Sequence, residues 1–170
     1  MIFFLKWDKS SLSSNSCIPF MVLKEHKAAI KALAWCPWNN GLLVTGGGKQ
    51  DGTIKFWNAF SGANTKCIDT ESQISGLLWS AHNRELVSSH GDPHNKLSIW
   101  KFPNFNKVGD LIGHSERVLS IVMSPNGETV ASLAADETLR FWECFKTFQS
   151  YKSVYSTPVT TGRLNFYNIR

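Results

Sequence analysis

Residues 113–142 read GHSERVLSIVMSPNGETVASLAADETLRFW, and this stretch decides the fold. It opens with Gly113-His114, closes with Phe141-Trp142 and contains three apolar runs of strand length. The breaks between the runs carry turn residues, which are Ser124-Pro125-Asn126-Gly127 in the first break and Asp136-Glu137 in the second. The stretch therefore predicts a single antiparallel sheet.

The same pattern returns along the chain at a regular period. Three strand-like runs end in a tryptophan, with spacings of 43 and 42 residues: Trp57, Trp100 and Trp142. A second marker runs in phase with the first, at spacings of 44 and 44 residues: Ala34-Trp35-Cys36-Pro37, Leu78-Trp79-Ser80-Ala81 and Val122-Met123-Ser124-Pro125. A period of about 40–45 residues with four short strands, a Gly-His start and a tryptophan finish is typical of the blades of WD-repeat propellers.

The sequence therefore predicts an all-β fold, a partial WD-repeat β-propeller of about three blades plus the remnant of a preceding blade. Residues 1–25 are assigned to the remnant, 26–146 to the three blades and 147–170 to a flexible C-terminal tail that ends Ile-Arg. Within the remnant, Ile2 to Trp7 and Phe20 to Leu23 are expected to be strands. Because three blades leave open sheet edges, we expect the C-terminal part of a larger propeller, or a chain that assembles with whatever completes it.

Resemblance to WD-repeat proteins implies a buried, hydrogen-bonded tetrad in each complete blade. The residues that match it are His114, Ser132, Asp136 and Trp142 in the third blade and His26, Thr45, Asp51 and Trp57 in the first. A buried aspartate needs donors, which the histidine and the hydroxyl supply while the indole N–H extends the chain. The second blade has no histidine at the matching start and only Asn95 near the turn, so we expect it to be the least rigid.

Composition and charge exclude nucleic-acid and membrane partners. Hydrophobic residues make up 42% of the chain, enough for a core, and the net charge is +5. Lysine and arginine are scattered without a run of five, whereas a nucleic-acid-binding arm would concentrate them. The chain has no apolar stretch of 18 residues, and Lys6 and Asp8 interrupt its apolar N-terminus, so we expect neither a membrane span nor a signal peptide.

Several stretches are more specific than a generic WD repeat. They follow one another in order: Glu25 to Trp38, Gly46-Gly47-Gly48, Ser72-Gln73-Ile74, Glu85 to Gly91, Trp100 to Pro103, Gly113 to Leu119, Ala135 to Trp142 and the final Ile169-Arg170. Together they resemble the last three blades and the tail of the Fizzy and Fizzy-related family, whose members recruit substrates to the anaphase-promoting complex, a ubiquitin ligase. The resemblance implies a binding protein of the nucleus and cytoplasm. Its propeller would bind short degrons, and its tail would dock on tetratricopeptide-repeat subunits of the ligase.

Four residues match degron-binding positions of that family. Glu137 matches an acidic position in the destruction-box groove, where it would accept hydrogen bonds from the degron's arginine; a solvent-exposed turn residue is the alternative. Gln73 and Arg117 match positions that help to read a second degron, lysine-glutamate-asparagine, with ordinary loop polarity as the alternative. Lys49 stands where relatives often carry threonine, and its charge would repel the lysine of that degron.

The chain end matches the family's C-terminal Ile-Arg, so Ile169 and Arg170 are the expected docking residues. The preceding residues would act as a tether, or in part as a strand that closes the ring. A generic WD-repeat interaction scaffold is one alternative interpretation. An inactive truncated product is another, because the family's earlier blades and its N-terminal ligase-contacting box are absent from this sequence.

The sequence indicates no metal site, cofactor or catalytic centre. The four cysteines form no CxxC and no zinc-type cluster, so we interpret them as reduced thiols of an intracellular protein: Cys17, Cys36, Cys67 and Cys144. His90 and His94 could ligate a metal, but their loop also matches a His-Gly turn of the family. Gly46 to Gly48 lack the GK[ST] of a phosphate-binding loop and are interpreted as glycines that turn the backbone.

Overall fold

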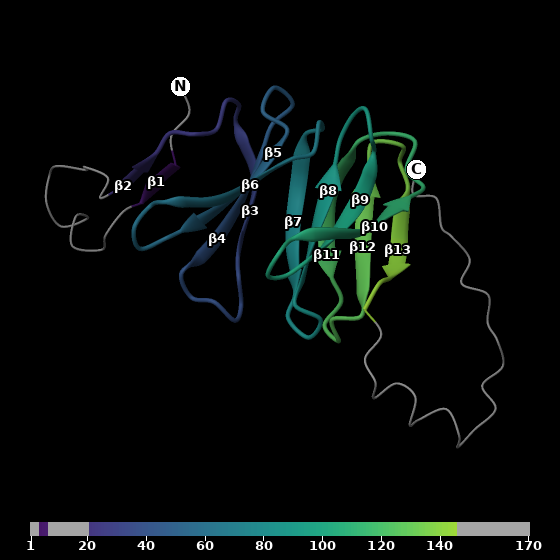
Figure 1. The fold of residues 1–170 in the computed structure, drawn as a ribbon. Coiled ribbons are helices and arrows are strands. Elements are labelled where there is room, and N and C mark those ends of the chain that lie inside the picture. The colour runs from purple at the N-terminus through teal and green to yellow at the C-terminus, as the bar shows by residue number, and fades with distance from the viewer. Residues whose placement is uncertain (1–3, 7–20, 146–170) are drawn as a thin grey trace, which may run out of the picture. The chain divides into compact units, whose positions relative to one another are not determined.

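The computed structural model describes residues 4–6 and 21–145. Within these ranges every regular element is a β-strand, and the strands form antiparallel sheets (Figure 1). None of the described residues belongs to a helix that could cross a membrane. The chain divides into two compact units, Met1–Leu77 and Leu78–Arg170.

The first unit contains a four-stranded sheet whose strands follow one another in the chain: β3 (Ile30–Trp35), β4 (Leu42–Gly47), β5 (Thr53–Asn58) and β6 (Asn64–Asp69). The apolar strands β4 and β5 are buried over most of their length. The outermost strand β6 is polar and largely exposed, as suits a strand with one free edge. We call β3–β6 the first blade.

A two-stranded ribbon precedes this sheet. In it, β1 (Phe4–Lys6) pairs antiparallel with β2 (Met21–Leu23). Leu23 packs with Leu43 and Trp57 of the first blade in a small apolar cluster. Both strands fall where the sequence predicted strands of a preceding blade, while the loop between them lies outside the described residues.

Seven further strands follow: β7 (Ile74–Ser80), β8 (Glu85–His90), β9 (Lys96–Lys101), β10 (Asn106–Ile112), β11 (Val118–Met123), β12 (Thr129–Ala134) and β13 (Leu139–Glu143). They form a sheet in the order β10-β9-β8-β7, the second blade, and a sheet in the order β11-β12-β13, the third blade. The division between the two compact units falls within β7.

An apolar core joins the second and third blades inside the second unit. Val87, Leu97 and Ile99 of β8 and β9 pack there with Val118 and Val130 of the third blade, and with Phe145 just after β13. The strands β8 and β9 are buried on both faces over most of their length, as expected for strands in the middle of a packed sheet. The predicted fold class, an all-β partial propeller of about three blades and a remnant, is confirmed. A fourth strand after Trp142 would lie outside the described residues.

Two residues of the glycine triplet lie in a strand and not in a turn. Gly46 and Gly47 lie in β4, and neither they nor Gly48 has a positive φ. A Cβ at Gly47 would collide with the carboxylate of Asp51, and one at Gly46 would collide with the side chain of Ile74. The interpretation as turn glycines was therefore wrong for these two residues, which allow close packing against the strand instead.

Candidate functional site

A chain of hydrogen bonds crosses the third blade from a tryptophan to an aspartate. Trp142 Nε1 donates to Ser132 Oγ at 2.8 Å, Ser132 Oγ lies 2.7 Å from His114 Nε2, and His114 Nδ1 lies 2.9 Å from Asp136 Oδ2. An indole N–H can only donate, so Ser132 accepts from Trp142 and its hydroxyl donates a hydrogen bond to Nε2 of His114. Nδ1–H then donates to the carboxylate. We call this arrangement the relay, and a neutral imidazole satisfies all of its groups.

Asp136 ties two loops of the third blade together. Its carboxylate also accepts from the Thr138 hydroxyl at 2.7 Å, from the Thr138 N–H at 3.0 Å and from the Ser115 N–H at 3.1 Å. Burial by itself raises the pKa of this carboxyl. The hydrogen bonds from Thr138, His114 and the two backbone N–H groups outweigh burial and hold the pKa well below its ordinary value. Asp136 therefore carries its negative charge inside the blade.

The first blade has a relay of the same form. Trp57 Nε1 donates to Thr45 Oγ1 at 2.8 Å, and Thr45 Oγ1 lies 2.6 Å from His26 Nε2. His26 Nδ1 bonds to Asp51 Oδ2, which completes the path from indole to carboxylate. The four residues proposed from the sequence are thus joined by hydrogen bonds in this blade, as they are in the third.

The second blade takes its relay histidine from within a strand. Trp100 Nε1 donates to Ser88 Oγ at 2.8 Å, and Ser88 Oγ lies 2.8 Å from Nε2 of His90, two residues further along β8. Burial first, and then the charge of Lys96, lowers the pKa of His90 to about 4. The imidazole is therefore neutral at physiological pH, and its Nε2 accepts a hydrogen bond from the Ser88 hydroxyl.

Sequence reasoning missed His90 because it looked for a histidine ahead of the blade's first strand. A usable signal was present. Ser88 and Trp100 are twelve residues apart, as are Thr45 and Trp57. That spacing identifies the relay hydroxyl of the second blade, and His90 then lies on the same face of the same strand.

Asn95 links the second blade to the third. Its Nδ2 donates to the carbonyl oxygen of Ser115 at 3.1 Å, and its φ of 46° lies in the left-handed region that asparagine tolerates. Its Oδ1 and the Nδ1 of His90 are buried and have no hydrogen-bond partner among the described residues. The second blade therefore does not close its relay with a carboxylate.

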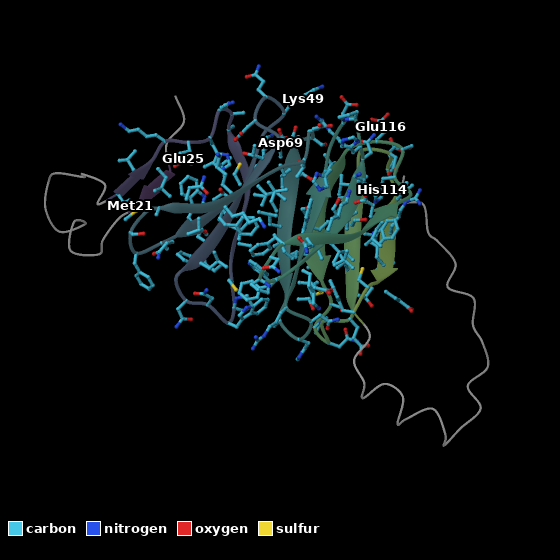
Figure 2. All side chains as sticks on the ribbon, in the orientation of Figure 1. Met21, Glu25, Lys49, Asp69, His114 and Glu116 are labelled. Carbon is cyan, nitrogen blue, oxygen red and sulfur yellow. The ribbon has the colours of Figure 1, made fainter. Side chains whose placement is uncertain are left out.

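Lys49 and Gln73 lie at one end of the strands of the first unit. Lys49 is exposed in the turn between β4 and β5, and Gln73 is half-buried just before β7. Figure 2 shows Lys49 beyond the strand ends, at the end of the sheet where β6 finishes with Asp69.

Arg117 and Glu137 lie on neighbouring loops of the third blade. The N–H of Ala135 donates to the carbonyl oxygen of Arg117 at 2.9 Å, which joins the turn before β13 to the loop before β11. Glu137 has a φ of 60°, and its N–H donates to Ala134 O at 3.2 Å. Both charged side chains are exposed. Figure 2 shows the adjacent Glu116 at the outer end of this blade, with His114 further inside. The blade thus presents a cation and a carboxylate to solvent from adjacent, hydrogen-bonded loops.

The four degron-binding candidates are divided between the two compact units. Lys49 and Gln73 belong to the unit Met1–Leu77, and Arg117 and Glu137 belong to the unit Leu78–Arg170. The expected docking residues, Ile169 and Arg170, lie outside the described residues.

These groups are suited to hydrogen bonding and ion pairing with a polypeptide. Within residues 4–6 and 21–145 no three histidine, cysteine or acidic side chains are grouped so that they could hold a metal ion. Cys36, Cys67 and Cys144 are free thiols, and burial raises the pKa of Cys144 to about 11, so this thiol is protonated at neutral pH.

Comparison with known proteins gives the family. The WD domain, G-beta repeat family matches residues 17–58 and 105–143. The protein "Cell division cycle 20.1, cofactor of APC complex" of Arabidopsis thaliana is 54% identical over 155 residues, which cover 91% of this chain and 34% of that protein. The chain belongs to the Cdc20/Fizzy family of WD-repeat proteins.

Two further matches support the assignment to the Cdc20/Fizzy family. The "Anaphase-promoting complex subunit cdc20" of Dictyostelium discoideum is 49% identical over 140 residues, or 82% of this chain and 28% of that protein. A chain in the crystal structure of the mitotic checkpoint complex matches with a TM-score of 0.74 and 44% identity, covering 77% of this chain and 41% of that one. This chain spans about a third of the length of the curated relatives it matches. The family resemblance seen in the sequence is confirmed.

Proposed function

We propose that this chain is the degron-reading part of an activator of the anaphase-promoting complex, and that it acts by binding. The observation that carries the proposal is its identity of about half, over most of its length, to proteins described as cofactors or subunits of that complex. The exposed pair of Arg117 and Glu137 on the third blade supports it, because a reader of charged peptide motifs needs such groups on rigid loops.

Glu137 is the residue we assign to the arginine of a destruction-box-type degron. Its turn is fixed by hydrogen bonds, and a carboxylate and a guanidinium can form two parallel hydrogen bonds. Arg117 would pair with a carboxylate of the degron, and Gln73 would offer an amide donor and acceptor. Lys49 is exposed at its end of the sheet and would repel a lysine, which disfavours degrons of the lysine-glutamate-asparagine type.

The docking element in this proposal is the C-terminal Ile169-Arg170. An apolar side chain, a guanidinium and a terminal carboxylate within two residues suit a polar-rimmed groove on a tetratricopeptide-repeat subunit of the ligase. The same function implies that the protein is located in the nucleus and cytoplasm, where it would encounter the ligase and its substrates.

Capture of the purified ligase by the immobilised full chain tests the docking step. We expect deletion of Ile169-Arg170 to weaken capture at least about tenfold, because a charged anchor is lost. The matched control is Arg163→Ala, which removes an arginine from the same C-terminal region and should leave capture unchanged within about twofold. Equal capture after the deletion would contradict docking through this end. Absence of capture by the unaltered chain would contradict the activator function and favour a generic WD-repeat scaffold.

A further inference from the structure

A thiol and an ammonium group face each other on the first blade. Cys67 of β6 lies directly opposite Lys55 of β5 in the antiparallel register, and Lys55 Nζ lies 3.7 Å from Cys67 Sγ. Cys67 is exposed to solvent, whereas Lys55 is only 8% exposed. The pair therefore joins a buried charge to a sulfur atom that small solutes can reach.

The ammonium group of Lys55 lacks a strong hydrogen-bond acceptor. It has three N–H donors, and a sulfur atom is a weak acceptor. Besides that sulfur, residues 4–6 and 21–145 offer it Oε2 of Glu25 at 3.8 Å, which is beyond hydrogen-bond distance. The same carboxylate oxygen accepts from Asn64 Nδ2. Because unsatisfied donors on a buried charge are costly, an oxygen atom attached to the sulfur of Cys67 would be stabilised here.

The second blade has an anionic oxygen at the corresponding position. Asp110 and Cys67 both lie ten residues after a blade tryptophan. Asp110 lies opposite Ser98, which faces the relay hydroxyl of its blade as Lys55 does in the first. The Asp110 carboxylate accepts from Ser98 Oγ at 2.7 Å and pairs with Lys96 Nζ at 2.9 Å. The outer strand of a blade can therefore hold an anionic oxygen at this position when a lysine is beside it.

Two other thiols of the described chain differ from Cys67. Cys36 is buried, and Cys144 is half-buried, with its pKa raised to about 11 by burial. Cysteines that react with oxidants are exposed to solvent and commonly have a cationic neighbour. Of these three thiols Cys67 alone is exposed, and Lys55 gives it the cationic neighbour.

We propose that Cys67 is a site of reversible oxidation by hydroperoxides, and that the Lys55 ammonium group holds the oxidised sulfur as a sulfenate. The sulfur attacks the terminal oxygen of the peroxide, so that an S–O bond forms, the O–O bond breaks and the thiol proton leaves with the departing water or alcohol. The sulfur loses two electrons, which the peroxide gains. The sulfenic acid gives its proton to water, and the sulfenate oxygen accepts a hydrogen bond from Lys55 Nζ. This site is separate from the degron-reading residues and does not depend on the proposed function.

A thiol reductant reverses the oxidation. One reductant thiol displaces water from the sulfenic acid and forms a mixed disulfide with Cys67; a second then releases the Cys67 thiol and leaves as a disulfide of the reductant. Lys55 contacts both Cys67 and Glu25, the residue before the relay histidine His26. Oxidation therefore draws the ammonium group toward the sulfur and weakens its ion pair with the loop before the first blade.

A short pulse of hydrogen peroxide on the full chain, followed by dimedone and peptide mass spectrometry, tests the proposal. We expect the dimedone adduct on Cys67 to exceed that on Cys36 or Cys144 at least about tenfold. Lys55→Met should lower the Cys67 adduct at least about threefold, whereas Lys55→Arg, which keeps a cation, should stay within about twofold of the unaltered chain. The matched control Lys66→Met removes the same charge from the neighbouring position and should change the adduct by less than about twofold. Dithiothreitol added before dimedone should abolish the adduct.

Equal Cys67 adducts in the unaltered chain and in a folded Lys55→Met variant would overturn the proposal, as would no adduct on Cys67. Because Lys55 is buried, a variant that fails to fold would reveal itself by labelling of the buried Cys36. Glu25→Gln then decides, since it removes the competing carboxylate from an exposed position. It should raise the Cys67 adduct at least about twofold, and an unchanged or smaller adduct would contradict the role of the Lys55 ammonium group.

Discussion

Neighbouring residues in this chain have opposite roles. Asp136 and Glu137 are adjacent carboxylates in one turn. Asp136 is held by His114, Thr138 and Ser115 inside the third blade, whereas Glu137 is exposed to solvent. The number of donors around each carboxylate, and not its place in the sequence, separates a residue that holds the blade from one that can meet a partner.

We predict that Asp136→Asn lowers the free energy of unfolding of the chain by roughly 2 kcal/mol, because an amide cannot accept from all the donors that surround the carboxylate. The matched control, Glu137→Gln, should change it by less than about 0.5 kcal/mol. Urea denaturation at neutral pH measures both. The pKa of Asp136 is held low in the folded state, so its contribution is present above pH 4 or so and is lost as the pH falls further. Equal effects of the two substitutions would show that the relay carboxylate is dispensable.

His90 should give the second blade a distinct response to acid. The folded chain holds the pKa of His90 at about 4, compared with 6.5 as the ordinary value, so folded protein binds fewer protons than unfolded protein between these pH values. Stability should therefore fall by up to roughly 3 kcal/mol as the pH is lowered through this window. NMR titration should show the His90 ring unchanged from pH 8 to about 5. His90→Gln should remove this part of the pH dependence, and identical acid profiles of the two proteins would contradict it.

The relay residues could be predicted from the sequence only where the expected type of residue stood at the expected position in the repeat. His26 and His114 stand ahead of their blades, so the repeat identified them. His90 does the same work from inside a strand, and no repeat position marks it.

At the level of strands and sheets, prediction from the sequence failed where the backbone closely approaches a side chain. The period of tryptophans predicted the number and order of the sheets, since each strand is a local pattern. The glycine triplet was misread because Gly46 faces the side chain of Ile74, which lies 28 residues further along the chain. A close approach of this kind has no signature in local sequence.

We predict that Gly47→Ala destabilises the chain by roughly 1–3 kcal/mol, because the added methyl group would displace the Asp51 carboxylate from His26. Gly109→Ala is the matched control on another strand, since a Cβ there meets nothing within 4 Å. It should be neutral or slightly stabilising. Thermal and urea unfolding report both changes, and a Gly47→Ala protein as stable as the control would refute the packing role.

At the level of the whole molecule, each unit exposes apolar side chains on a sheet. Leu33 and Trp35 are exposed on β3, and Val122 and Phe141 are exposed on the third blade. Strand faces that carry such side chains are normally covered by another sheet. The chain, which spans about a third of its relatives' length, therefore presents surfaces that suit further protein contacts.

We predict that the isolated chain binds a destruction-box peptide poorly. By the family resemblance, Glu137 lines a groove between the last and the first blade, so this chain would supply one wall of the groove, and half of the contacts give far less than half of the affinity. Fluorescence polarisation with a labelled RxxL peptide should show no saturation below roughly 100 µM. Saturable binding at micromolar concentration would show that one wall is sufficient.

The position of His90 within β8 also affects how the sequence of the protein can evolve. In the first and third blades the loop ahead of the blade holds His26 or His114, so mutation of those loops breaks a relay. The corresponding loop of the second blade, which includes Gln73, supplies no relay histidine, because His90 on the strand β8 bonds to the relay hydroxyl instead. Substitutions can therefore accumulate in that loop while the blade stays folded. Selection can then change the side chains of that loop independently of stability.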